Sequence, residues 1–136
     1  MVVKVKKIIP TEHQEQEAVV QWWAANRHVY GYLPDVLMAI PNGSHKSMAM
    51  AAKFKREGLR PGAPDLFLAV QKYALGGLFL EMKRMNWKPP RAGTKAHAKY
   101  MVQQSFHEML QTQNYRAVFC AGHNAAINEI QHYLKT

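Results

Sequence analysis

Apolar positions along the chain recur with two different periods, which predict helices that alternate with short strands. The expected helices cover residues 11–27, 44–57 and 95–113 and the segment that follows Gly122. The expected buried strands are short apolar runs at 36–40, 66–70, 78–80 and 116–120. This order predicts an α/β fold, a mixed central β-sheet flanked by helices. The last strand follows a crossover helix, so we expect it to lie parallel to a neighbour.

Residues 62–83 hold the most informative stretch, because two predicted strands there carry an acid at one end. Asp65 begins the first strand, Glu81 closes the second, and Lys83 follows two residues later. If the strands pair as a hairpin, Asp65 lies across from Glu81, and side-chain alternation puts Glu81 and Lys83 on one face. Two close carboxylates beside apolar strands lose hydration and repel each other. A divalent cation such as Mg²⁺ or Mn²⁺ relieves both costs.

A metal ion held by two carboxylates beside a lysine suits the hydrolysis of a phosphodiester bond. The alternative interpretation is that Asp65 ends a turn while Glu81 and Lys83 form a surface pair. An isolated E-x-K pattern has this simpler meaning more often. Gly62 lies just before Asp65, and we expect it to permit a close approach of the backbone to a ligand.

Composition limits the kind of protein. The chain has 136 residues, 48% of them hydrophobic, so we expect one globular domain over residues 1–136, with residues 1–10 as a lead-in. Cys120 is the one cysteine, which excludes an internal disulfide and suits a reducing cytosol. Its apolar neighbours favour buried packing over a nucleophilic role. No apolar stretch approaches the roughly 20 residues of a membrane span.

The net charge of +9 predicts a polyanionic partner, most simply nucleic acid, with an ordinary solvated basic surface as the alternative. Basic residues gather on both sides of the predicted strand pair, within 46–60 and within 83–99. Trp87 lies in the second group, where it could stack on a base or cover the edge of the core. The side chains expected to contact nucleic acid are Lys46, Lys53, Lys55, Arg56, Arg60, Arg84, Trp87 and Lys88.

Two of the predicted helices direct further polar residues toward this region. In the first helix, Glu12 and Glu15 share the apolar stripe, so either could point at the metal centre, or it could complement the helix dipole. In the third helix, Gln103 shares a face with Leu110, whereas Gln104 lies on the polar side. Gln103 is therefore better placed to point at the sheet.

These stretches, in this order, resemble the virus-type replication-repair nuclease (VRR-NUC) domain, a branch of the P-D-(D/E)-x-K nuclease superfamily. The resemblance covers residues 11–134 and rests on the order and spacing of the stretches, and it is to the small stand-alone form of phages and prophages. The matching stretches are 12–16 with Trp22-Trp23-Ala24, Ile40-Pro41-Asn42-Gly43, Glu57-Gly58, Gly62-Ala63-Pro64-Asp65-Leu66, Gly77-Leu78-Phe79-Leu80-Glu81-Met82-Lys83, Gln103 with Leu110, Tyr115, Gly122 and Tyr133-Leu134.

The resemblance implies a restriction-endonuclease-like core and an endonuclease that depends on Mg²⁺ or Mn²⁺. Asp65 and Glu81 would be metal ligands, with the backbone carbonyl of Met82 as a third. Lys83 would position the attacking water and offset the charge of the transition state.

The resemblance also implies a glutamate from the first helix, for which we favour Glu15 over Glu12. Gln103 matches a helix glutamine that contacts the lysine or the phosphate. Small relatives resemble homodimeric Holliday-junction resolvases, which implies branched DNA as the partner and a role in recombination or repair in the cytoplasm of a bacterial or phage-infected cell. We expect no membrane and no small-molecule cofactor. A non-catalytic module that binds branched DNA and a nuclease that processes flaps or nicks are the alternatives.

Overall fold

Four strands form one sheet at the centre of the computed structural model, which describes residues 8–41 and 47–135. The strands lie side by side in chain order and are β1 (Leu37–Ala39), β2 (Leu66–Leu68), β3 (Leu78–Lys83) and β4 (Arg116–Ala121). β2 pairs antiparallel with both β1 and β3, whereas β3 and β4 are parallel. The predicted mixed sheet and the parallel placement of its last strand are confirmed.

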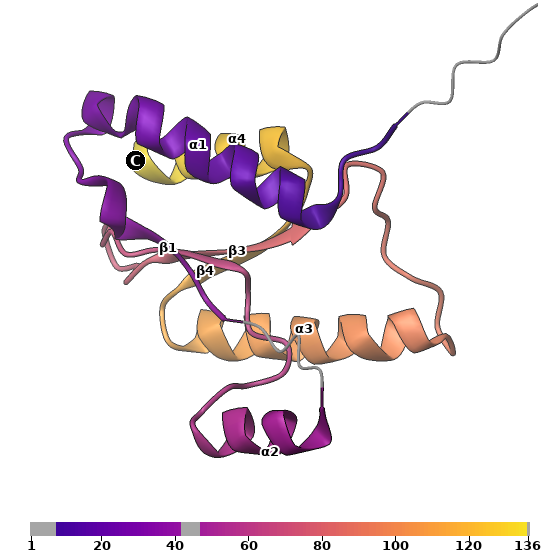
Figure 1. The fold of residues 1–136 in the computed structure, drawn as a ribbon. Helices are drawn as coiled ribbons and strands as arrows, with labels where there is room; N and C mark the ends of the chain where they lie inside the picture. The colour runs from indigo at the N-terminus through magenta and orange to yellow at the C-terminus, as the bar shows by residue number, and fades with distance from the viewer. Residues whose placement is uncertain (1–7, 42–46, 136) are drawn as a thin grey trace, which may run out of the picture.

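Helices cover both faces of this sheet (Figure 1). On one face lie α1 (Glu12–Tyr30) and α4 (His123–Lys135), which contact each other and β3. On the other face α3 (Lys95–Thr112) contacts β4. α2 (Met48–Arg56) lies on the α3 side of the sheet, and none of its residues is buried (Figure 1). No helix in the described part of the chain is both long and apolar enough to cross a membrane.

The apolar core fills the space between the sheet and the α1–α4 pair. Leu66, Leu68 and Leu80 point into it from the strands and are fully buried. Val19 and Trp23 meet them from α1. Because side chains alternate along a strand, the residues between these leucines point to the opposite face, which α3 covers in part. The core on one face thus dictates which strand residues are available on the other.

The ends of α1 follow from local capping. Thr11 and Gln14 form a capping box, in which each side chain accepts a hydrogen bond from the other's backbone N–H. The helix continues about one turn beyond the predicted end, to Tyr30. It stops there because Gly31 adopts a left-handed conformation with φ of 81°.

Several other elements begin or end at residues that differ from the predicted ones. β3 continues to Lys83, past the predicted end at Leu80, because its parallel pairing with β4 extends that far. β2 stops at Leu68, short of the predicted Val70. α2 begins at Met48 behind an N-cap serine, and the predicted start of this helix lies outside the described residues. Between β1 and α1 a short 3₁₀ helix, Pro34–Val36, turns the chain.

Candidate active site

Asp65 and Glu81 face each other across β2 and β3, as the hairpin prediction required. Leu66 pairs with Leu80, and the Asp65 backbone N–H donates to the Leu80 carbonyl at 3.1 Å, so the two acids are opposite neighbours. The Asp65 Oδ2 atom accepts a hydrogen bond of 2.7 Å from the Met82 backbone N–H. Only 9% of Asp65 and 3% of Glu81 is exposed. The two carboxyl groups are therefore both buried and lie next to each other.

This proximity changes the protonation of Glu81. The pKa of Glu81 is raised to about 10, first by burial, then by a hydrogen bond with Asp65 and by the negative charge of Asp65. The positive charge of Lys83 acts in the opposite direction but is a smaller effect. Because this pKa lies above neutral, the Glu81 carboxyl group retains a proton at neutral pH. A cation bound between them would take the place of that proton.

Lys83 and Gln103 complete the buried polar group. Lys83 leaves β3 on the same face as Glu81, and its Nζ donates a hydrogen bond of 2.8 Å to Oε1 of Gln103. Both residues are 8% exposed. Gln103 lies on α3 and points at the sheet, as its helical position predicted, whereas Gln104 is half-buried. An ammonium group is thereby fixed beside the acid pair.

The two glutamates of α1 have separate surroundings. Glu12 lines the cavity above the acid pair, and its negative charge helps to raise the pKa of Glu81. Glu15 is 2% exposed and accepts a hydrogen bond from the backbone N–H of His123, and the His123 Nδ1 atom lies 3.2 Å from its Oε2. Glu15, which the sequence interpretation favoured, therefore binds the N-terminus of α4 and does not line the cavity. Residues three apart on a helix differ by about 60° in direction, which accounts for the separation.

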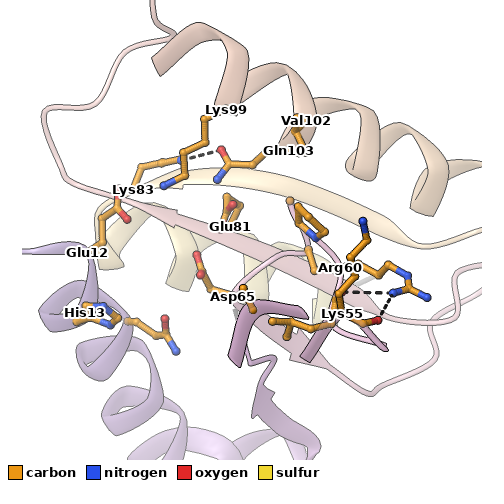
Figure 2. A pocket seen from close by; sticks show the side chains of 16 residues that line it. Glu12, His13, Lys55, Arg60, Asp65, Glu81, Lys83, Lys99, Val102 and Gln103 are labelled. Carbon is orange, nitrogen blue, oxygen red and sulfur yellow. Dashed lines mark hydrogen bonds between the residues drawn. The ribbon is translucent and has the colours of Figure 1, made fainter. Parts of the chain in front are cut away.

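A cavity of about 610 Å³ opens over these side chains. Asp65, Glu81 and Lys83 form its floor, and three helices contribute its walls (Figure 2). The walls consist of Glu12, His13 and Gln16 from α1, Ala51, Lys55, Leu59, Arg60, Pro61, Gly62 and Ala63 from α2 and the loop after it, and Lys99, Val102 and Gln103 from α3. Acidic groups thus lie at the bottom of a pocket with basic groups on opposite walls.

Comparison with known proteins identifies this architecture. Neither a family model nor a curated protein matches the sequence. Among solved structures, the fold is similar to that of a VRR_NUC domain protein, with a TM-score of 0.68 and 28% sequence identity. The match covers 96% of this chain and 92% of that chain. The chain has a VRR-NUC fold.

The acid pair of this VRR-NUC fold suits a hard divalent cation. Among the described residues, no group of three or more His, Cys, Asp and Glu side chains is arranged to hold a metal. Mg²⁺ is instead commonly held by one or two carboxylates and keeps several waters. Asp65 and Glu81 supply two such oxygen ligands, and the backbone of Met82 lies beside them. The donor set therefore fits Mg²⁺ or Mn²⁺.

The predicted basic residues divide into groups. Lys55 and Arg60 line the cavity. Arg84 donates hydrogen bonds of 3.0 and 3.3 Å to the carbonyls of Ile9 and Pro10, so it fixes the segment before α1. Lys53, Arg56 and Lys88 are exposed and do not line the cavity. Lys46 lies outside the described residues.

Two loop residues, Trp87 and Gly62, make packing contacts that the sequence did not decide. Trp87 is half-buried and stacks on Phe119, with 5.5 Å between the ring centroids, so it covers the edge of the sheet. Gly62 makes its close approach to α3, since a Cβ atom there would lie 2.9 Å from the carbonyl oxygen of Val102. Gly62 also lines the cavity, so the close approach to a ligand expected there stays a prediction. The space that glycine provides is filled by α3.

Lys99 is a cavity residue that the sequence interpretation missed. It lies on α3, one helical turn before Gln103, and lines the wall opposite Lys55 and Arg60. Residues four apart lie on one face of a helix, so the spacing between Lys99 and Gln103 could have predicted that Lys99 points toward the same cavity.

Proposed function

We propose that this chain is an endonuclease that depends on Mg²⁺ or Mn²⁺ and hydrolyses phosphodiester bonds in DNA. The observation that carries the proposal is the buried, face-to-face pair of Asp65 and Glu81, with the Lys83 ammonium group fixed beside it by Gln103. The VRR-NUC fold supports it, because the likeness indicates a nuclease-type domain. We propose a single nuclease domain over residues 1–136.

Asp65 and Glu81 would hold the metal ion, with the Met82 backbone carbonyl as a further ligand. When bound there, a divalent cation would neutralise the scissile phosphate and lower the pKa of a bound water. Lys83 adds positive charge where negative charge develops on the phosphate, and Gln103 fixes the direction of its ammonium group. Glu12, on the cavity wall, is the helix glutamate we now assign to this site in place of Glu15.

Basic side chains on the cavity walls would bind the DNA backbone. Lys55 and Arg60 lie on one wall and Lys99 on another, so phosphates on both sides of the scissile bond meet positive charge (Figure 2). The exposed Lys53, Arg56 and Lys88 would extend this surface. Contacts of this kind give affinity that depends on salt, with little reading of base sequence.

Within this class we propose a homodimeric Holliday-junction resolvase, which works in the cytoplasm in recombination or repair in bacterial or phage-infected cells. The support is the sequence resemblance to small stand-alone VRR-NUC proteins and the net charge of +9. A dimer would bring two acid pairs to symmetric strands of a four-way junction. We expect a dimer mass by sedimentation at micromolar concentration, and a monomer would favour flap or nick processing.

The test is cleavage of a labelled immobile four-way junction beside a flap, a nicked duplex and an intact duplex. Each substrate is incubated with Mg²⁺, with Mn²⁺ and with chelator. Paired symmetric nicks in the junction that require metal would support the resolvase, whereas metal-dependent cutting of the flap or nick alone would restrict the proposal to the wider nuclease class. Binding of all substrates without cutting would contradict catalysis and favour a non-catalytic binding module.

A further inference from the structure

The Lys83 ammonium group lies over two aromatic rings as well as beside Gln103. Its Nζ atom is 5.8 Å from the centroid of the Trp87 ring and 5.9 Å from that of the Phe119 ring. We propose that Trp87 and Phe119 form an aromatic seat for this ammonium group, and that Trp87 is a positioning residue that acts through Lys83. The catalytic part of this inference rests on the proposed function of Lys83.

The two rings of the seat are themselves held in place. Trp87 and Phe119 are stacked with an angle of 10° between their planes. Tyr100 contacts both rings, at centroid distances of 5.9 and 5.2 Å, and His107 stacks on Phe119 at 4.3 Å. These residues come from the loop after β3, from β4 and from α3. Several elements therefore fix the rings in one arrangement.

The ring faces suit the requirements of a buried lysine. Lys83 is 8% exposed, so its charge has lost most of its hydration. The negative face of an aromatic ring attracts a cation within about 6 Å of its centroid without accepting a hydrogen bond from it. The seat therefore compensates the charge while the ammonium N–H groups remain donors for Gln103 and for an anion in the cavity.

His107 adds no competing charge to this arrangement. It is 2% exposed, and its Nε2 atom has no hydrogen-bond partner among the described residues. Burial, and then the positive charge of Lys83, lower the pKa of His107 to about 4. The imidazole is thus neutral at the pH of a nuclease assay and serves as one more ring behind Phe119.

The seat gives Trp87 a role other than base stacking, which its position in a basic loop suggested. A tryptophan that stacks on a base contributes to DNA affinity. A tryptophan that orients Lys83 contributes to the rate of the chemical step and leaves affinity unchanged. The two roles therefore predict opposite changes in KM and kcat.

The experiment compares Trp87→Leu with Trp87→Phe, which keeps a ring, and with Trp22→Leu. The last variant removes a half-buried tryptophan of α1, which lies on the opposite face of the sheet from α3. The first readout is the NMR shift of the Lys83 methylene protons in labelled protein, which ring currents move upfield. We expect this shift to diminish in Trp87→Leu, to be largely kept in Trp87→Phe and to be unchanged in Trp22→Leu. A Lys83 shift without ring-current displacement in the wild type would overturn the seat.

The second readout is the cleavage kinetics of the same variants. We expect Trp87→Leu to lower kcat about tenfold, or about 1.4 kcal/mol, with KM within about twofold of wild type. Trp87→Phe should restore most of the rate. A raised KM with unchanged kcat would overturn the positioning role in favour of base stacking. Because the NMR readout requires no turnover, a wild type that displays the shift but cuts no DNA would contradict the proposed function and leave the seat intact.

Discussion

The ammonium group of Lys83 donates a hydrogen bond of 2.8 Å to Oε1 of Gln103, and this bond joins β3 to α3 at the floor of the cavity. A lysine has a long and flexible side chain, so a fixed acceptor decides where its charge lies. Gln103 is the acceptor, and the adjacent Gln104 is half-buried elsewhere on the helix.

Replacing this acceptor should slow the chemical step. Gln103→Met keeps the volume of the side chain but removes the hydrogen bond to Lys83, and we expect kcat to fall about 10-fold to 100-fold, since hydrogen bonds to charged groups are worth about 1.5–3 kcal/mol. Single-turnover cleavage measures this change. Gln104→Met is the matched control, and equal rates for the two variants would contradict the assignment of Gln103.

Substitution of the two glutamates of α1 should have different effects, one on activity and the other on stability. Glu12→Gln should lower the cleavage rate about 10-fold to 100-fold, because Glu12 lines the cavity, and should change the free energy of unfolding by less than about 0.5 kcal/mol. Glu15→Gln should lower the free energy of unfolding by about 1–2 kcal/mol, because it weakens the bonds to His123 at the start of α4. Cleavage assays and urea unfolding measure both. Loss of activity confined to Glu15→Gln would reverse the assignment.

The acid pair predicts a dependence of stability on pH and metal. The pKa of Glu81 is raised in the folded state, so its contribution to stability is full below its ordinary pKa and is lost as pH rises toward about 10. Between about pH 7 and pH 9, His107 is neutral in both states, and Cys120 and Tyr133, with raised pKa values, have yet to lose protons in the folded state. In chelator, Tm should therefore fall across this window.

Two controls isolate that effect. Mg²⁺ should restore Tm at about pH 9, because it takes the place of the proton on Glu81, and Glu81→Gln should flatten the decline, because an amide does not titrate. Thermal unfolding in chelator and in Mg²⁺ at both pH values provides the measurement. A wild-type Tm that is independent of pH and of Mg²⁺ would be inconsistent with a buried acid pair that binds metal.

Substitution by alanine should destabilise the fold for two reasons at Gly62 and for one reason at Gly58. Both have positive φ, 83° and 101°, so alanine at either position costs about 1–2 kcal/mol. A Cβ atom at Gly62 would also lie 2.9 Å from the Val102 carbonyl oxygen, whereas no atom lies within 4 Å of that position at Gly58. Gly62→Ala should therefore be less stable than Gly58→Ala by about 1 kcal/mol or more in urea unfolding. Equal costs would contradict the contact between this loop and α3.

The sequence predicted the fold and the floor of the site because both depend on local periodicity. Alternation along β3 was enough to place Glu81 and Lys83 on one face, and a hairpin was enough to bring Asp65 opposite Glu81. The face of α3 that carries Gln103 followed from helical spacing in the same way. Each of these inferences depended on the geometry of a single helix or strand, or of two adjacent strands.

The sequence left open what depends on packing between distant elements. Glu12 and Glu15 differ by a small rotation of α1, and only the position of α4 decides which one faces the cavity. The role of Trp87 depends on Phe119, which lies 32 residues later on β4. Gly62 is close to Val102 on α3, a contact that no local pattern reveals.

The most direct test of the central claim is single-turnover cleavage of a four-way junction by wild type and by Asp65→Asn in Mg²⁺, with junction affinity measured in parallel. Asparagine keeps the size of the side chain and an oxygen that can accept from the Met82 N–H, so the fold should persist. We predict that Asp65→Asn binds the junction as tightly as wild type and does not cut it. Cutting by Asp65→Asn at the wild-type rate would contradict the assignment of the acid pair as the metal-binding active site.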